Sequence, residues 1–201
     1  MSALPIEKKY YSVSEYLALE TEIRYEYFDG EIVAMAGASI PHNRLTLKTA
    51  FALEKRIGKK CNVLASDAKV EIIENRKYVY PDVVLTCDSE DIENQKFIKR
   101  PKLIIEVLSE STQNYDKSEK WLLYQTLPDL QYYVLISQYE YLVEVYEKID
   151  NTPFWKYGKL EGLESILSLE KLGLEIPLNE IYENVILSEK ENKGHNGIFD
   201  S

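Results

Sequence analysis

Two carboxylate residues stand inside apolar stretches that have the pattern of short strands. Asp82 interrupts the apolar run of residues 79–85, and Glu106 lies within residues 101–109, PKLIIEVLS. Even a neutral polar group costs about 2–7 kcal/mol when it is buried without a partner. Each carboxylate therefore needs a cation beside it, either a basic side chain or a bound metal ion. Hard oxygen ligands of this kind suit Mg²⁺ or Mn²⁺.

The stretch that carries Glu106 has the pattern of a central strand. Successive strand residues point to opposite faces, so Ile104, Glu106 and Leu108 share one face. The residues of the other face are Leu103, Ile105 and Val107. Because both faces are apolar, the pattern predicts a strand that other elements cover on both sides.

A charged helix is expected directly after this strand, since Asp116 and Glu119 have the spacing of a capping box. Lys120 lies one turn into that helix and is well placed to reach back to the end of the Glu106 strand. The alternative is that Lys120 is an exposed i,i+4 partner of Asp116, because such pairs are common and weak. Lys117 is a second basic residue on the same predicted helix face.

Three further polar residues have both an ordinary and a functional interpretation. Glu26 is either a solvent-facing strand residue paired with Arg24 or an additional acid of a metal site. Asp67 fits a bulge or turn residue that bonds the backbone better than a metal ligand. His42 stands at the entrance of the helix that Pro41 begins, where a lone histidine is more often a cap or a surface group. We assign His42 no catalytic role.

Other stretches predict the elements around these residues. The Asp29-Gly30 pair predicts a β-hairpin within residues 24–37. A helix is expected from Pro41 to about Gly58. Its predicted inward residues are Leu47, Ala50, Leu53 and Ile57. Strand regions are expected at residues 62–73 and 78–88, an antiparallel hairpin at 129–148 and an edge strand at 152–162.

Together these pieces resemble the Uma2-like (DUF820) family, which is common in cyanobacteria and comprises predicted nucleases of the PD-(D/E)xK restriction-endonuclease-like fold. The matching segments span most of residues 12–150 and are RYEYFDGEIVAMAG (24–37), PHN (41–43), SD (66–67), YPDVVL (80–85), PKLIIEVLS (101–109), YDKSEKWLLY (115–124) and the hairpin at 129–148. One departure concerns the signature lysine, whose place two residues after Glu106 holds Leu108. The family also places a lysine in the following helix, so the resemblance implies Lys120 as the candidate and Lys117 as the reserve.

The resemblance implies an α/β (α+β) fold in which a mixed central β-sheet is flanked by helices, with an N-terminal β-hairpin extension. It also implies a metal-dependent DNA endonuclease in which Asp82, Glu106 and Lys120 are catalytic. Asp82 and Glu106, with Glu26 as a further candidate, would bind Mg²⁺ or Mn²⁺. The alternative is a catalytically inactive relative that binds nucleic acid or a protein partner. The acidic composition and the displaced lysine favour this alternative, whereas the intact Asp82 and Glu106 oppose it.

Composition sets the remaining expectations. The 201 residues are 45% hydrophobic and 29% charged, which predicts a single domain over residues 1–187. Residues 188–201 are polar and predict a disordered tail. The chain lacks an apolar run of about 18 residues, so no membrane span is expected.

Charge and cysteine usage bear on partners and location. The net charge of −10 argues against simple electrostatic binding to DNA, but bound cations and local lysines can still attract phosphate. Cys61 and Cys87 have no metal-site spacing, so we interpret them as reduced core thiols of a cytoplasmic protein. A homodimer is expected, because nucleases that cut both strands commonly pair two active sites.

Overall fold

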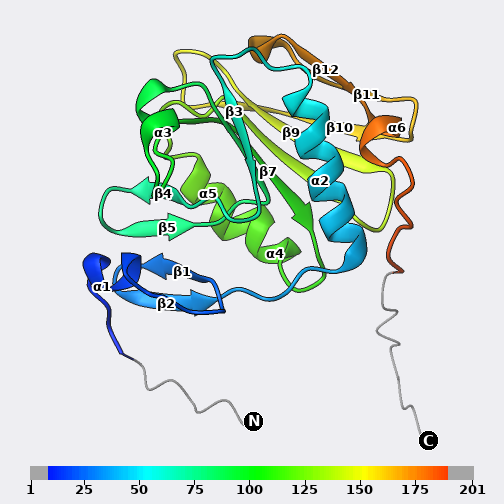
Figure 1. Cartoon of the computed structure of the whole chain (residues 1–201). Helices are drawn as coiled ribbons and strands as arrows, with labels where there is room; N and C mark the ends of the chain where they lie inside the picture. The colour runs from blue at the N-terminus through cyan, green and yellow to red at the C-terminus, as the bar shows by residue number, and fades with distance from the viewer. Residues whose placement is uncertain (1–8, 190–201) are drawn as a thin grey trace, which may run out of the picture.

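A six-stranded mixed β-sheet forms the centre of the computed structural model, which describes residues 9–189 (Figure 1). Its strands are β3 (Asn62–Ala65), β6 (Val83–Thr86), β7 (Pro101–Leu108), β8 (Tyr132–Ser137), β9 (Leu142–Lys148) and β10 (Trp155–Glu161). Their order is β10-β9-β8-β7-β6-β3. β7 runs parallel to β8, and the other neighbouring pairs are antiparallel. The predicted mixed central sheet is confirmed.

β7 is buried on both faces, as its sequence pattern predicts. Leu103, Ile105 and Val107 belong to one buried apolar cluster, to which α2 (Ile40–Glu54) contributes. Ile104 and Leu108 belong to a second cluster on the opposite face. Glu106 shares that second face and is also buried. The strand therefore holds one carboxylate in an otherwise apolar layer.

The Glu106 face is covered by one continuous helical segment made of α4 (Gln113–Tyr115), a π-helical turn η1 (Asp116–Lys120) and α5 (Trp121–Tyr124). The predicted capping box is wrong, because the helix begins at Gln113 and the Asp116 N–H donates to the Thr112 carbonyl. Asp116 therefore lies inside the helical segment, with its side chain buried. Helical turns of the π type are frequent at functional sites.

α2 covers the other face of the sheet and begins at the N-cap residue Ser39, whose hydroxyl accepts from the His42 N–H. It ends at Glu54, earlier than the predicted Gly58. Its buried residues are Leu45, Thr46, Thr49, Ala52 and Leu53. The prediction that Leu47 faces inward is wrong, since 57% of this residue is exposed.

A second, four-stranded sheet lies beside the first one. Its strands are β1 (Tyr25–Phe28), β2 (Glu31–Ala34), β4 (Val70–Ile73) and β5 (Lys77–Val79), in the order β2-β1-β5-β4. The predicted N-terminal hairpin is confirmed, with positive φ angles of 49° at Asp29 and 101° at Gly30. β1 also pairs with β5 through Tyr27 and Tyr78, so the hairpin joins the rest of the fold.

Each of the strand regions predicted at 62–73 and 78–88 divides into two strands that belong to different sheets. The first break begins at Ser66, which has a positive φ of 62°. The second break falls at Pro81 and Asp82. The Ser66 N–H donates to the Asp82 carbonyl, so the two breaks lie together. This crossing places Asp82 directly before β6.

The remaining elements complete the two faces. They are α1 (Val13–Leu17), α3 (Ser89–Glu93), β11 (Ile166–Leu169), η2 (Glu170–Leu172), β12 (Leu174–Pro177) and α6 (Leu178–Ile181). β11 and β12 form a two-stranded sheet that packs on the same apolar cluster as α2. The predicted tail at 188–201 lies outside the described residues except for Ser188 and Glu189. The single-domain assignment of residues 1–187 stays a prediction.

The two cysteines form a disulfide between Cys61 and Cys87, so the expectation of reduced thiols is wrong. The register explains the pairing, because Asn62 lies opposite Thr86 in the β3–β6 pair and the cysteines are the next residues outward. Their Cα atoms are 4.0 Å apart. The expectation of a cytoplasmic location loses this support and stays a prediction.

Membrane insertion was not expected from the sequence. Within residues 9–189, no helix is long and apolar enough to cross a membrane.

Candidate active site

Asp82 and Glu106 come together at the junction of β6 and β7. Val83 pairs with Ile105 in this antiparallel ladder, so Asp82 falls opposite Glu106. The Asp82 N–H donates to Glu106 Oε2 over 3.4 Å, and Asp82 Oδ2 accepts from the Val107 N–H at 2.7 Å. The two carboxylates singled out in the sequence therefore occupy one site, held by the backbone of the central strand.

Lys120 reaches this site from the helical segment, as its position in the sequence predicts. Its Nζ lies 3.0 Å from Glu106 Oε1, and the Tyr124 hydroxyl donates to the same oxygen at 2.6 Å. Lys120 Nζ is also 3.5 Å from Asp116 Oδ1. The exposed-partner alternative for Lys120 is excluded, because the residue is only 6% exposed.

Glu26 enters the same cluster from β1 of the second sheet. Its Oε1 lies 3.6 Å from Lys120 Nζ, and its Oε2 accepts from the Tyr115 hydroxyl at 3.1 Å. The alternative of a solvent-facing residue paired with Arg24 is wrong, since Glu26 is buried and Arg24 pairs with Asp67. Glu26 thus contacts the lysine of the site.

Three acidic side chains share one basic side chain in the cluster. Burial raises the pKa of Glu106 well above its ordinary value, and Lys120 offsets this only in part. Burial also raises the pKa of Asp116. Burial by itself would lower the pKa of Lys120, but Glu106, Glu26 and Asp116 outweigh it and hold that pKa well above the usual value. Lys120 is therefore a firmly protonated cation, whereas burial raises the pKa of Glu106 and Asp116 and so opposes their ionisation.

His42 is a member of the site that the sequence analysis left out. It lies in the first turn of α2, where its imidazole Nε2 is 3.1 Å from Asp82 Oδ2. Its side chain is only 13% exposed. The neighbouring Ser39 hydroxyl donates to Gln138 Oε1 at 2.6 Å, which fixes the start of α2 against the end of β8. No local sequence pattern predicts the contact between His42 and Asp82, because this contact depends on where α2 packs in the fold.

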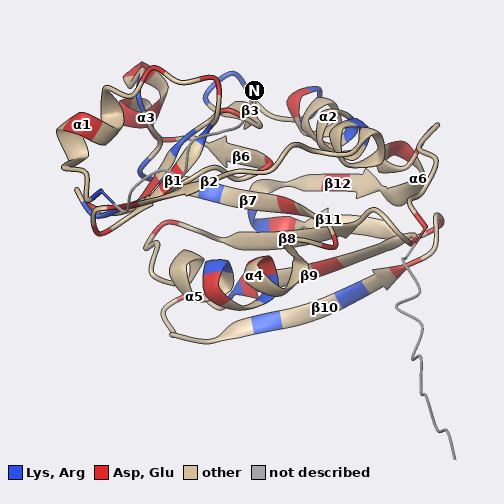
Figure 2. Cartoon of the chain, turned by 90° about the horizontal axis from the view of Figure 1, so that it is seen from below, with Lys and Arg blue, Asp and Glu red and all other residues tan. Residues whose placement is uncertain are grey.

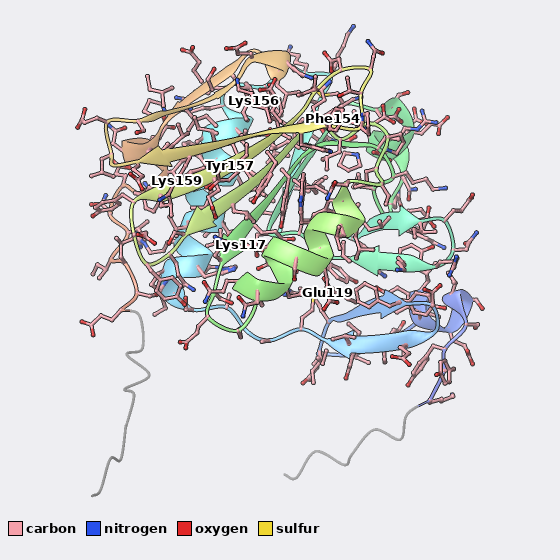
Figure 3. The ribbon with its side chains drawn as sticks, turned by 180° about the vertical axis from the view of Figure 1, so that it is seen from behind. Lys117, Glu119, Phe154, Lys156, Tyr157 and Lys159 are labelled. Carbon is pink, nitrogen blue, oxygen red and sulfur yellow. A yellow bond between two sulfur atoms is a disulfide. The ribbon has the colours of Figure 1, made fainter. Side chains whose placement is uncertain are left out.

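Two other residues weighed in the sequence lie away from the cluster. Asp67 is 70% exposed at its side chain and pairs with Arg24. Lys117 pairs with Glu144 of β9 at 2.5 Å. Figure 3 shows Lys117 on the side of the helical segment toward β10, where the Tyr157 hydroxyl donates to the same Glu144. The π-helical turn thus directs Lys117 and Lys120 to different partners.

The donor chemistry of the cluster suits a hard divalent cation. Three carboxylates, from Glu26, Glu106 and Asp116, lie around the ammonium of Lys120, and Asp82 lies beside Glu106. Asp116 Oδ1 is buried without a hydrogen bond. Within residues 9–189, no three acidic, histidine or cysteine side chains converge as a ready metal site. Mg²⁺ needs no such cage, because it is usually bound by one or two carboxylates together with water and substrate phosphate.

The family assignment follows from comparison with known proteins. The model of the Uma2 family, described as "Putative restriction endonuclease", matches residues 13–179. This chain belongs to the Uma2 family.

Charged positions along the helical segment that carries Lys120 are visible in Figure 2. The segment lies wholly within the matched range.

Relatives support the same assignment. Two uncharacterised proteins of Synechocystis sp. (strain ATCC 27184 / PCC 6803 / Kazusa), slr1290 and sll1609, are 35% and 37% identical to this Uma2 chain. The first match covers 87% of this chain and 92% of the relative, and the second covers 77% and 89%.

A solved structure shares the fold. It is described as a putative nuclease belonging to DUF820 from Anabaena variabilis ATCC 29413, with a TM-score of 0.69 and 16% identity. The match covers 86% of this chain and 97% of that one, which confirms the restriction-endonuclease-like fold.

Proposed function

We propose that this Uma2 protein is a metal-dependent endonuclease that hydrolyses phosphodiester bonds of DNA. The observation that carries the proposal is the meeting of Asp82, Glu106 and Lys120, which come from three separate segments of the chain. A buried lysine beside Glu106, which also contacts Asp82 within the central sheet, is an arrangement suited to phosphoryl chemistry. The family description supports the same reaction class.

Asp82 and Glu106 would hold Mg²⁺ or Mn²⁺ through their carboxylate oxygens. When bound, such an ion polarises the scissile phosphate and lowers the pKa of the attacking water. Both contacts described for the Asp82 carboxylate, from Val107 N–H and from His42, fall on Oδ2. Oδ1 of Asp82 is therefore the oxygen best placed to take a ligand. Glu26 and Asp116 neutralise Lys120 and would add to the negative field around the ion.

The chain's own groups prepare the site for the phosphate. Val107 and His42 fix the Asp82 carboxylate from two sides. Tyr124 fixes Glu106. Lys120 supplies an ammonium that stabilises the charge that develops on the phosphate oxygens. Because burial excludes water around Lys120, this interaction is stronger than it would be at the surface.

The test is cleavage of supercoiled plasmid by the purified full chain. With Mg²⁺ or Mn²⁺ we expect nicked and linear products, and with EDTA we expect none. Asp82→Asn should abolish cleavage and metal binding measured by calorimetry while the circular dichroism spectrum stays unchanged. Asp67→Asn is the matched control, since Asp67 is exposed outside the cluster, and it should cleave like the parent. Unchanged metal affinity in Asp82→Asn would overturn the assignment of the metal site.

A second candidate is a catalytically inactive protein of the nuclease fold that binds nucleic acid or a protein partner. The observation that favours it is the burial of Lys120 among three carboxylates, which leaves little of its ammonium open to substrate. Absence of nicking with either ion, together with retained calorimetric binding of DNA, would establish this candidate in place of the endonuclease.

A further inference from the structure

An exposed apolar stripe runs along the outer side of α2. Ile40 is 78% exposed, Leu47 57% and Phe51 67%. Arg44 lies between them and is also exposed. The four positions, which we call the α2 stripe, follow one another at steps of four, three and four residues. This spacing keeps side chains on one helix face and is the spacing of a helix–helix seam.

The stripe is additional to the face that α2 buries in its own fold. Leu45, Ala52 and Leu53 point into the apolar cluster beneath the helix. α2 is thus apolar on two faces, whereas a surface helix normally has a single apolar face. Apolar side chains gathered on an exposed face mark an interaction site more often than scattered ones do.

We propose that the α2 stripe is the interface of a homodimer, in which α2 packs antiparallel to α2 of a second copy across a two-fold axis at Leu47. A two-fold axis requires a surface that complements itself. At a rise of about 1.5 Å per residue, Arg44 lies about 4.5 Å from Leu47 along the helix and Phe51 about 6 Å on the other side. Arg44 of one copy therefore meets Phe51 of the other, twice in each dimer.

Charge supports this occupant. Within the described residues, no ion pair or hydrogen bond engages the Arg44 guanidinium. A guanidinium over an aromatic ring is a favourable contact. Lys55 also lies near this ring, with its Nζ 6.0 Å from the ring centre of Phe51. Its charge is already neutralised by Glu180 within the same chain.

The helix ends match in the same arrangement. Ile40 and Glu54 each lie seven residues from Leu47, so Glu54 of the second copy falls at the N-terminal end of α2. The free N–H groups at that end favour a negative charge.

The apolar surface continues beyond the helix. A pocket of about 360 Å³ lies beside the start of α2 and is lined by Ile40, Pro41, Arg44, Asn184, Ile186 and Leu187. Ile186 is 86% exposed. A second copy that covers the stripe would also cover the rim of this pocket, which enlarges the interface beyond the two helices.

The β10 edge of the main sheet offers a less suitable interface. Edge strand β10 carries Lys156 and Lys159 along its exposed length, as Figure 3 shows. Lysines on an edge strand discourage pairing with a further strand. The α2 stripe has one charged residue and three apolar ones, so it suits contact with a second copy better than the β10 edge does.

The interface would bring two candidate sites close together. His42 lies five residues from Leu47, so the two histidines would be about 15 Å apart along the shared helix direction. This inference concerns assembly and does not rest on the proposed cleavage, because the oligomeric state is measured without substrate or metal.

The first experiment is light scattering on the full chain from about 1 to 100 μM. We expect a dimer that Leu47→Glu converts to a monomer, with the dissociation constant raised at least tenfold. Leu122→Glu is the matched control, since Leu122 is also an exposed helical leucine but lies on the opposite side of the sheet, and it should stay dimeric. Two results would overturn the proposal. One is a parent protein that is monomeric at 100 μM, in which case the stripe is left to another partner or to residues 190–201. The other is a dimer that persists in the Leu47→Glu variant.

The second experiment tests the antiparallel geometry. Leu47→Cys should form a covalent dimer under mild oxidation, because Leu47 meets its own copy at the axis. Ile40→Cys should not, since the two copies of that residue would be about 21 Å apart along the helix. The parent is the control, as its cysteines are already paired with each other. Cross-linking through Ile40→Cys in place of Leu47→Cys would show a parallel pair and overturn the arrangement.

Discussion

Lys120 supplies the positive charge for three buried carboxylates. Its contacts with Glu106, Asp116 and Glu26 come from β7, its own helical segment and β1 respectively. Removing one partner of a buried ion pair is costly because it leaves an uncompensated charge. Lys120 therefore links the stability of the fold to the chemistry of the candidate site.

Lys120→Met should lower the free energy of unfolding by about 3–5 kcal/mol at pH 7. Without the ammonium, burial would raise the pKa values of Glu106 and Asp116 further above those of the unfolded chain. The folded state would then hold more protons than the unfolded state, so stability would fall as pH rises. The deficit relative to the parent should shrink when urea unfolding is repeated at pH 5. Cleavage at pH 7 should fall by two or more orders of magnitude.

Lys117→Met is the control for that substitution, because Lys117 is 41% exposed and pairs with Glu144 outside the cluster. It should change stability by less than about 1 kcal/mol. Equal effects of the two substitutions would show that Lys120 does not act as the charged partner of the site.

The site could be predicted from the sequence only where local patterns carry the information. Asp82 and Glu106 interrupt apolar runs, and Lys120 follows the Glu106 strand at a short distance. His42 and Asp116 gave no such signal. Their contacts depend on the docking of α2 against β6 and on a π-helical turn that the capping-box pattern at Asp116 did not anticipate.

At the scale of elements, α6 is tied to the residues that follow α2 by the ion pairs of Glu180. Glu180 accepts two hydrogen bonds from the Arg56 guanidinium, at 3.1 and 2.7 Å, and also contacts Lys55. The Arg56 hydrogen bonds, helped by Lys55, lower the pKa of Glu180 to about 2. Glu180 is 23% exposed at its side chain, so solvent screening reduces what this shift contributes to stability.

Glu180→Gln should lower stability at pH 7 by about 1 kcal/mol, which corresponds to roughly 2–4 °C in Tm for a chain of this size. Since the folded pKa is depressed, the contribution is complete above the ordinary glutamate pKa and is lost as pH falls toward 2. The Tm difference between variant and parent should therefore disappear near pH 2. Glu183→Gln is the control, because Glu183 is 61% exposed and forms its ion pair with Lys48. A difference that persists at pH 2 would mean that the ion pair is not its cause.

Elements with a regular pattern were predictable from the sequence, and their partners were not. The alternation in β7 and the Asp29-Gly30 turn gave the right strands. Leu47 was misplaced because α2 has apolar residues on two faces, so periodicity alone cannot tell which of them is buried. The disulfide was missed because it depends on the register between β3 and β6, which brings Cys61 opposite Cys87.

At the scale of the whole molecule, net charge opposes the proposed substrate. The chain carries a net charge of −10, and a DNA duplex is a dense polyanion. Proteins that bind DNA through a basic face lose affinity steeply with salt, with a log–log slope of about −0.9 for each phosphate contacted. Under the proposed function the site is a carboxylate cluster, so attraction for DNA would come chiefly from a bound divalent cation.

DNA binding should therefore require Mg²⁺ and depend only weakly on monovalent salt. The measurement is fluorescence anisotropy of a labelled DNA duplex mixed with the Lys117→Met variant, in which the candidate site is intact. We expect this variant not to bind the duplex in EDTA. With Mg²⁺ at low temperature, before cleavage is appreciable, the salt slope should be shallower than about −4, since few phosphates can meet a basic side chain. Asp82→Asn should lose the Mg²⁺-dependent binding, because it removes a proposed ligand of the ion. Tight binding in EDTA with a steep slope would instead point to a basic surface of the molecule as the main contact with DNA.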